Sequence, residues 1–454
     1  MKAFKIGIYL ALFAALMVSN ADAQFFSLCR DGSKDDLVLD IVAHSEHAWR
    51  LEEKITKYYY NNDPLPSGLK EFVLDDVQDL VRNIDEKRNS RTAVLFHAVG
   101  SDNKNLCTWL ITGEEIVSHI VPAPSMEDIK NKQSIIMGAL GVTRMAKDRS
   151  PIWRGVKAAQ PESASSQISE ETALEEISDL LIPGPINIAL DNKNVRTLVV
   201  VPIFGFGTLP FAAFNFRNDY LVDHMSIIIA PSFRIFTEDK KMVRQRSFTE
   251  PIIVGDPCDN KCYHDPEWIF KPLGGARKEA IEIATKFPKT VALIGSEATE
   301  ENVKLLLKEK NKSGLVFIAT HGIADEKDPN DKSFLLLSDG RWTAREIYND
   351  AKEAKLESGF LAVMSACQTG LGKVFDVGNT GLARAWHSAG AANVVMSLWS
   401  VHDDATKLLM TKFIEFARTE APDIALQRAM QEARKNNQYS RPVYWAGFNI
   451  FGAP

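Results

Sequence analysis

Short apolar segments alternate with helical patterns along the C-terminal part of the chain, and this alternation is the strongest constraint on its fold. Helical patterns such as Glu300–Leu307 and Thr380–Ser388 separate the apolar segments. Strands that alternate with helices pair in parallel through right-handed crossovers, and near-continuous apolar strands belong to a sheet covered on both faces. The order therefore predicts a doubly wound, mostly parallel α/β sheet with helices on both faces. Its expected strands are Ile252–Val254, Val291–Ile294, Leu315–Ala319, Phe360–Met364 and Val394–Ser397.

The N-terminal part has a different pattern. Apolar residues at helical spacing predict helices between residues 36 and 90, and residues 158–172 have the composition of an exposed linker. Turn residues separate short β-branched or aromatic segments, which predict strands. We divide the chain into residues 1–23, a helical segment 24–90, an N-terminal half 91–245 and a C-terminal half 246–454. The strands expected in the N-terminal half are Thr92–Val99, Leu106–Thr112, Glu115–Val121, Thr197–Val201 and shorter ones near Phe211 and Ile227.

Residues 1–23 have the features of a secretory signal peptide. Lys2 and Lys5 precede the uncharged apolar run Ile6–Val18, and Ala21-Asp22-Ala23 is a small-residue cleavage site. The alternative is an uncleaved membrane anchor, but the run is shorter than the roughly 20 residues that a span needs. We expect an exported protein, periplasmic or extracellular in a bacterium, with no membrane span after cleavage.

Charge argues against a nucleic-acid partner. The chain of 454 residues has a net charge of −6, from 53 basic and 59 acidic residues. Removing residues 1–23 takes away two lysines and one aspartate, which leaves 51 basic and 58 acidic residues and a net charge of −7. Proteins that bind phosphate backbones carry a basic surface instead.

Export changes what the five cysteines are expected to do. An oxidising compartment favours disulfides, and an odd number leaves one thiol over. Cys258 and Cys262 are close enough in sequence to pair, Cys29 with Cys107 is a possible second bridge, and Cys367 is then left as a thiol. A metal site formed by Cys258, Cys262 and His264 is the alternative, but it lacks a fourth ligand of matching spacing. We expect neither a metal nor a cofactor.

Two of the predicted strands end in reactive residues. Leu315–Ala319 leads into Thr320 and His321, and Phe360–Met364 leads through Ser365 and Ala366 into Cys367. Sites in open parallel sheets form beyond the carboxyl ends of the strands. If these strands are neighbours, the imidazole and the thiol face one crevice. A thiolate forms readily beside an imidazole and attacks a carbonyl, and the imidazole then protonates the leaving amine. The backbone N–H groups of Gly322 and Cys367 are candidates for an oxyanion hole.

At these residues the sequence resembles the CHAT domain, a caspase-like peptidase family related to separase. The signatures around the histidine and the cysteine are followed by further motifs in the family's order, and the similarity extends over about residues 90–454. The motifs are Ala319-Thr320-His321-Gly322, Ser365-Ala366-Cys367-Gln368-Thr369-Gly370, Gly381-Leu382-Ala383-Arg384, Ser397-Leu398-Trp399-Ser400-Val401-His402-Asp403, Tyr444-Trp445-Ala446-Gly447-Phe448 and, earlier, Gly255-Asp256-Pro257.

The resemblance implies a cysteine endopeptidase with His321 and Cys367 as a dyad, a degenerate N-terminal half and an active C-terminal half. It implies no third catalytic side chain, so a backbone carbonyl or a water would orient the imidazole. The chain departs from many relatives at Val377-Gly378-Asn379, where they have Gly-Glu-Gly. We expect a protein or peptide substrate and consider an activating protein partner. The alternative is a non-catalytic CHAT-fold scaffold or sensor that binds a protein partner.

A basic residue at the cleaved bond would require a carboxylate in the substrate pocket, because a buried cation must be paired. Asp403, just after the last predicted strand, is the first candidate, and Asp376 is the second. Asp403 could instead cap the helix that follows it. The basic residues between Lys240 and Arg246, within the polar loop 237–250, predict either a solvated linker or a site of self-processing.

Overall fold

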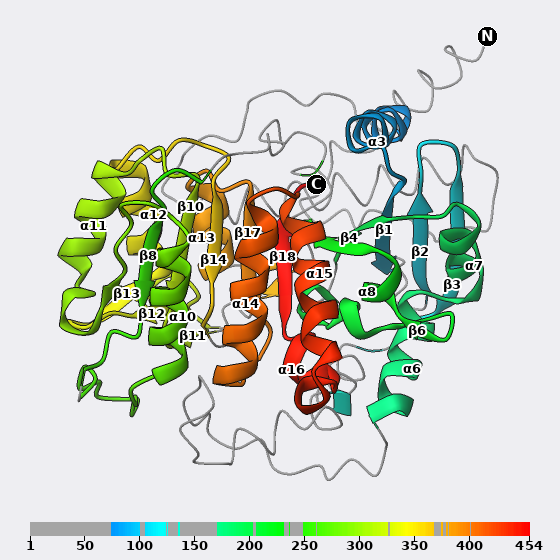
Figure 1. The fold of residues 1–454 in the computed structure, drawn as a ribbon. Helices are drawn as coiled ribbons and strands as arrows, with labels where there is room; N and C mark the ends of the chain where they lie inside the picture. The colour runs from blue at the N-terminus through cyan, green and yellow to red at the C-terminus, as the bar shows by residue number, and fades with distance from the viewer. Residues whose placement is uncertain are drawn as a thin grey trace, which may run out of the picture.

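The molecule is built around one eleven-stranded sheet in the computed structural model (Figure 1). The sheet has the strand order β3-β2-β1-β4-β7-β18-β17-β14-β10-β8-β9. The structure describes residues 74–99, 105–123, 125, 135–136, 170–202, 206–230, 236, 248–259, 261–325, 327–366, 374–375, 378–379, 381–399 and 401–454.

Most neighbouring strands in this sheet are parallel. The antiparallel pairs are β1 with β2, β2 with β3 and β17 with β18. Short sheets lie beside it, formed by β11–β13, by β15–β16 and by β5–β6. The strands of the main sheet are β1 (Thr92–Val99), β2 (Asn105–Ile111), β3 (Ile116–Pro122), β4 (Thr197–Val201), β7 (Ser226–Ile229), β8 (Ile252–Gly255), β9 (Leu293–Ile294), β10 (Leu315–Ala319), β14 (Leu361–Met364), β17 (Asn393–Ser397) and β18 (Phe448–Gly452). The short strands are β5 (Asn215–Phe216), β6 (Asp219–Tyr220), β11 (Gly322–Ile323), β12 (Phe334–Leu336), β13 (Arg341–Thr343), β15 (Val374–Phe375) and β16 (Gly378–Asn379).

Helices cover both faces of the C-terminal half of the sheet. Figure 1 shows α14 and α15 in front of β17 and β18, with α10 beside α14, whereas α11, α12 and α13 cover the other face. This alternation follows from right-handed crossovers that first run outward to β9 and then return toward β17. The α-helices are α3 (Leu74–Arg88), α6 (Glu170–Leu181), α7 (Gly184–Asn192), α8 (Leu221–His224), α10 (Gly274–Thr285), α11 (Glu300–Glu309), α12 (Ala344–Glu353), α13 (Leu382–Ser388), α14 (Asp403–Ala417), α15 (Pro422–Lys435) and α16 (Pro442–Trp445).

The two halves of the chain share this sheet. β7 of the N-terminal half pairs in parallel with β18, the last strand of the chain, through Ile229 and Phe451. One hydrophobic cluster extends from Leu95 in β1 to Phe451 in β18. The N-terminal and C-terminal halves therefore fold around a common core.

The predicted fold class is confirmed, and most strands have the expected positions. The strand expected near Phe211 is wrong: Phe211–Ala213 is a short 3-10 helix. Pro210 has no N–H to donate to a strand ladder, and its carbonyl accepts the N–H of Ala213 at 2.8 Å in the tight turn. The predicted signal peptide, the helices before Leu74 and the linker before Glu170 lie outside the described residues. Within the described part of the chain, no helix has the length and apolar character needed to cross a membrane.

Candidate active site

β10 and β14, the strands that lead toward His321 and Cys367, are parallel neighbours. Their register pairs Ile318 with Met364. The ladder continues beyond the strand end, where the N–H of Ser365 donates to the carbonyl of Ile318 at 2.8 Å. Neighbouring strands lie about 4.8 Å apart. The condition on which the sequence analysis depended, adjacency of these two strands, is therefore met.

His321 lies just beyond β10 and is held by its ring and by its backbone. Its Nε2 is 2.7 Å from the carbonyl oxygen of Lys271, and its carbonyl accepts the N–H of Leu336 at 2.9 Å. Since a carbonyl oxygen only accepts, Nε2 is the nitrogen that donates. In the neutral ring, Nδ1 is then the basic nitrogen. A backbone carbonyl thus fixes the tautomer and the orientation of this imidazole.

An aromatic contact adds to this hydrogen bond. The ring centroid of Phe270 lies 5.0 Å from that of His321, and Phe270 also packs edge-on against Phe334 in β12 at 6.3 Å. His321 is 3% exposed and Phe270 is 8% exposed. The segment that contains Phe270 and Lys271 therefore both packs against the imidazole and accepts its hydrogen bond.

This segment, which we call the histidine loop (residues 256–259 and 261–273), connects β8 with α10. Asp256 fixes both of its ends, because its carboxylate accepts the N–H of Leu273 at 3.0 Å and Nε of Arg277 at 3.1 Å. Burial raises the pKa of Asp256 above its ordinary value, although these donors oppose the shift. Asp256 is 1% exposed, and its hydrogen bond with Leu273 joins the start of the loop to its end.

An ion pair fixes the middle of the histidine loop. The guanidinium of Arg341 in β13 reaches both carboxylate oxygens of buried Asp265, at 2.6 and 2.7 Å, and Glu267 at 2.7 Å. The hydrogen bonds from Arg341 hold the pKa of Asp265 below its ordinary value. A two-pronged contact of this kind fixes orientation as well as distance. The loop is thus tied to the short sheet that follows His321.

The cysteines of the histidine loop form a disulfide between Cys258 and Cys262. A disulfide removes the two thiolates that the alternative metal site with His264 requires. Among the described residues, no group of three or more His, Cys, Asp or Glu side chains is arranged to hold a metal ion. Cys107 is also disulfide-bonded, and its partner lies outside the described residues, so pairing with Cys29 stays a prediction.

On the β14 side, Ala366 is held from the neighbouring strand. Its carbonyl accepts a short hydrogen bond from Oγ of Ser397, the last residue of β17. Cys367, Asp376 and Cys29 lie outside the described residues. Gly322, predicted to help form an oxyanion hole, begins β11 and pairs with Leu335 of β12.

Asp403 joins two helices. It lies in the first turn of α14, and its carboxylate accepts the N–H of Gly275 in the first turn of α10. The cap of α14 is His402, whose Nδ1 accepts the N–H of Ala405 at 3.3 Å. The alternative in which Asp403 caps its own helix is therefore wrong, because Asp403 caps α10 instead. Asp403 is 6% exposed.

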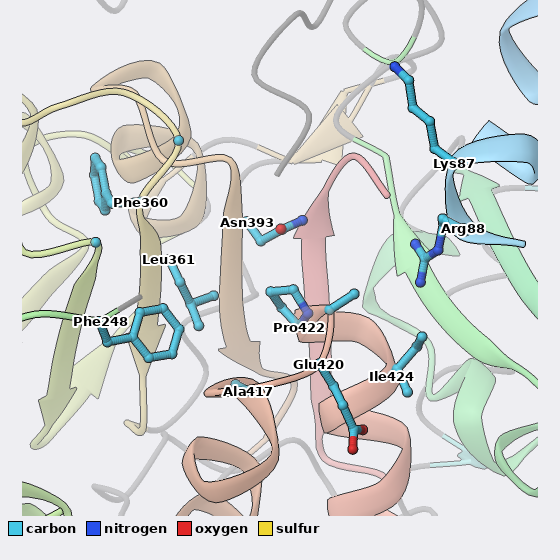
Figure 2. A pocket seen from close by; sticks show the side chains of 13 residues that line it. Lys87, Arg88, Phe248, Phe360, Leu361, Asn393, Ala417, Glu420, Pro422 and Ile424 are labelled. Carbon is cyan, nitrogen blue, oxygen red and sulfur yellow. The ribbon is translucent and has the colours of Figure 1, made fainter. Parts of the chain in front are cut away.

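A pocket of about 340 Å³ lies at the opposite edge of the sheet (Figure 2). Its lining includes Leu361 and Asn393, the first residues of β14 and β17, together with Arg88 of α3. Arg88 forms an ion pair with buried Asp423 of α15 at 2.6 Å. Because His321 follows the carboxyl end of its strand, this pocket is separate from the candidate site.

The histidine loop is the part of the site that sequence reasoning missed. Every residue has a carbonyl, so no pattern marks that of Lys271. Asp265 and Arg341 are 76 residues apart, and neither lies in a motif. The one available signal was Gly255-Asp256-Pro257, which belongs to the family's order of motifs but had no assigned role.

Comparison with solved structures finds a protein that shares the fold. Separase from Saccharomyces cerevisiae, in its complex with securin, matches with TM-scores of 0.53 and 0.55 at 12% and 11% identity, over 94% of this chain and 34% of separase. The Arg-specific cysteine proteinase gingipain R gives a TM-score of 0.40 at 11% identity, over 72% of this chain and 75% of the gingipain chain. At 12% and 11% identity, the likeness to separase concerns the fold alone.

Sequence comparison finds curated relatives and a family. Tetratricopeptide repeat protein 28 is 25% identical over 300 residues in Homo sapiens and 23% identical over 302 residues in Mus musculus. Each match covers 57% of this chain, which spans only 12% of the length of these relatives. The sequence profile of the CHAT domain matches residues 171–453, more than half of the chain. This protein therefore belongs to the CHAT domain family.

Proposed function

We propose that this protein is an exported cysteine endopeptidase that uses His321 and Cys367 and cleaves after a basic residue. One observation carries the proposal: β10 and β14 are parallel neighbours with Ile318 opposite Met364. Three residues further along each segment come His321 and Cys367. Equal advance along two neighbouring parallel strands favours an imidazole and a thiol at one edge of the sheet.

The chemistry follows from the tautomer of His321. With Nε2 donating to Lys271, Nδ1 can take the thiol proton of Cys367. The thiolate then attacks the scissile carbonyl carbon, and a carbon–sulfur bond forms. As the carbon–nitrogen bond breaks, the imidazolium returns the proton to the leaving amine. Water then hydrolyses the thioester and restores the thiol.

Export is supported by the cysteines. Disulfides persist in oxidising compartments and are rare in the cytosol. The Cys258–Cys262 disulfide lies in the histidine loop, so an oxidising environment is compatible with an assembled site. Residues 1–23 supply the proposed signal.

The preference for a basic residue rests on Asp403 and Asp376 as candidate pocket carboxylates. Asp403 already accepts the N–H of Gly275. An Asp403→Asn variant can keep that bond through its amide oxygen while losing the charge. We expect it to remain folded and to lose the preference for Arg and Lys, which profiling on a peptide mixture would measure. A folded Asp403→Asn variant with unchanged preference would shift the assignment to Asp376.

The test of the activity compares purified wild-type protein with Cys367→Ala and His321→Ala on peptides that vary the residue before the cleaved bond. Cleavage by the wild type alone would support the dyad, and intact mass would report any cut within residues 237–250. If the wild-type protein, with its Cys367 thiol shown to be reduced, cleaves no peptide, the peptidase proposal is overturned in favour of a module that binds a protein partner.

A further inference from the structure

The histidine loop presents an apolar side chain to solvent at the residue that precedes Phe270, which packs on the imidazole. Ile269 is 84% exposed, and its neighbour Phe270 is buried against His321. Single exposed aliphatic residues are common on protein surfaces. Ile269 differs from such residues in its position. Its Cα lies about 3.8 Å from that of Phe270, and the ring of Phe270 packs against the imidazole of His321. Half-buried Trp268 precedes it and packs on the cluster that contains Phe270.

Ile269 is held in place from both sides. The carboxylate of Asp265 accepts the N–H of Glu267 at 2.9 Å and that of Trp268 at 3.1 Å. On the other side, Phe270 is buried and the carbonyl of Lys271 is bonded to His321. A side chain presented by backbone that is already ordered can bind a partner at a small entropic cost.

The sheet order gives the side of the site on which Ile269 lies. β10 has β14 on one side and β8 on the other, and the histidine loop starts from β8. The loop and the segment that leads to Cys367 therefore come from opposite sides of the strand that precedes His321. A general acid must lie next to the leaving amine that it protonates. Substrate residues after the scissile bond are attached to that amine.

We propose that Ile269, with half-buried Trp268, forms a subsite that binds an apolar side chain of the substrate immediately after the cleaved bond. This inference rests on the proposed peptidase activity. Burial of an aliphatic pair removes apolar surface from water on both partners. Discrimination in such hydrophobic contacts is about 10-fold or somewhat more in kcat/KM.

The first experiment measures cleavage of quenched fluorescent peptides that share one cleaved residue and carry Leu, Ser or Asp after it. We expect the wild type to prefer Leu to Ser by about 10-fold in kcat/KM. Ile269→Ser should cleave the Leu and Ser peptides with similar kcat/KM, so that the preference for Leu is lost. Ile188→Ser is the matched control, since Ile188 is 62% exposed on α7, in the N-terminal half.

The second experiment needs no turnover. Binding of the same peptides, fluorescently labelled, is measured by anisotropy on Cys367→Ala protein with and without Ile269→Ser. If the Leu peptide binds more tightly than the Ser peptide and Ile269→Ser removes this difference, the subsite is supported even when the wild type cleaves nothing. That outcome would overturn only the peptidase proposal. Cleavage or binding without an Ile269-dependent preference overturns the subsite alone. Absence of both cleavage and binding overturns both proposals.

Discussion

His97 in the N-terminal half and His321 in the C-terminal half make the same hydrogen bond in different places. Nε2 of His97 lies 2.8 Å from the carbonyl of Leu181, and Nε2 of His321 lies 2.7 Å from that of Lys271. His97 is inside β1, opposite Thr108 of β2. His321 lies beyond the carboxyl end of β10, next to a loop.

Because the two histidines lie in different places, their surroundings also differ. His97 is fully buried beside Phe206, and burial lowers its pKa to about 4. His321 instead packs against a loop that an ion pair and a disulfide hold in place. A hydrogen bond from a histidine to a carbonyl is thus no sign of catalysis by itself. His97 and His321 differ in where they lie relative to the ends of their strands.

Replacement of each histidine gives the largest expected contrast. His321→Ala should lower kcat/KM by at least about 10³-fold, because it removes the proposed base and acid. His97→Ala should leave kcat per folded molecule unchanged while it destabilises the fold. Rates normalised to active-site titration, with thermal melts of both variants, would measure this. Equal losses of activity in the two folded variants would remove the distinction between the histidines.

The second prediction concerns how the free energy of unfolding changes at acid pH. Folded His97 has a pKa of about 4, against about 6.5 when unfolded, so between these values the unfolded chain binds more protons. Stability is therefore full above about pH 6.5 and falls as the pH drops toward 4, by about 3 kcal/mol from this residue. Burial also lowers the pKa of His402, which acts with the same sign.

His97→Gln should flatten this dependence, with the free energy of unfolding measured in urea from pH 7 to 4. The exposed His264→Gln is the control. An unchanged slope in His97→Gln would show that other groups set the acid sensitivity.

The disulfide of the histidine loop should change the free energy of unfolding by less than the acid titration of His97 does. Cys258 and Cys262 are four residues apart, and closure of so short a loop is worth about 2 kcal/mol in the chain-entropy account. The double variant Cys258→Ala, Cys262→Ala should lose about that much stability and show faster amide exchange near Lys271. A reductant would not isolate this effect, because Cys107 is also disulfide-bonded. Unchanged exchange in the double variant would show that the ion pair alone orders the loop.

The smallest expected effect comes from Arg341→Lys. Lysine keeps the charge but loses the two-pronged contact with Asp265, at a cost of about 1 kcal/mol. Because the loop holds the Lys271 carbonyl, kcat should fall about fivefold with little change in KM. Arg345→Lys, at the exposed pair with Asp331, should change stability by at most about 0.5 kcal/mol. If Arg341→Lys and Arg345→Lys have the same effect on kcat, the ion pair between Arg341 and Asp265 does not position His321.

The sequence alone predicted the fold class and the strands that lead to the candidate residues. The strands Thr92–Val99, Thr197–Val201 and Leu315–Ala319 were expected with the bounds they have. Apolar periodicity and strand–helix alternation are local signals, and parallel pairing brings the carboxyl ends of strands to one edge. The same reasoning placed His321 at that edge and failed at Phe211–Ala213, where a proline favoured a turn over a strand.

Only the tertiary structure decided what surrounds these residues. It selected the carbonyl of Lys271 for His321, paired Asp265 with Arg341 and joined Asp403 to Gly275, which is 128 residues away in the chain. It also merged the two halves into one sheet through β7 and β18. Contacts between distant residues depend on how preformed elements pack. The sequence therefore determined the strand ends that carry the reactive residues, while packing determined which groups orient them.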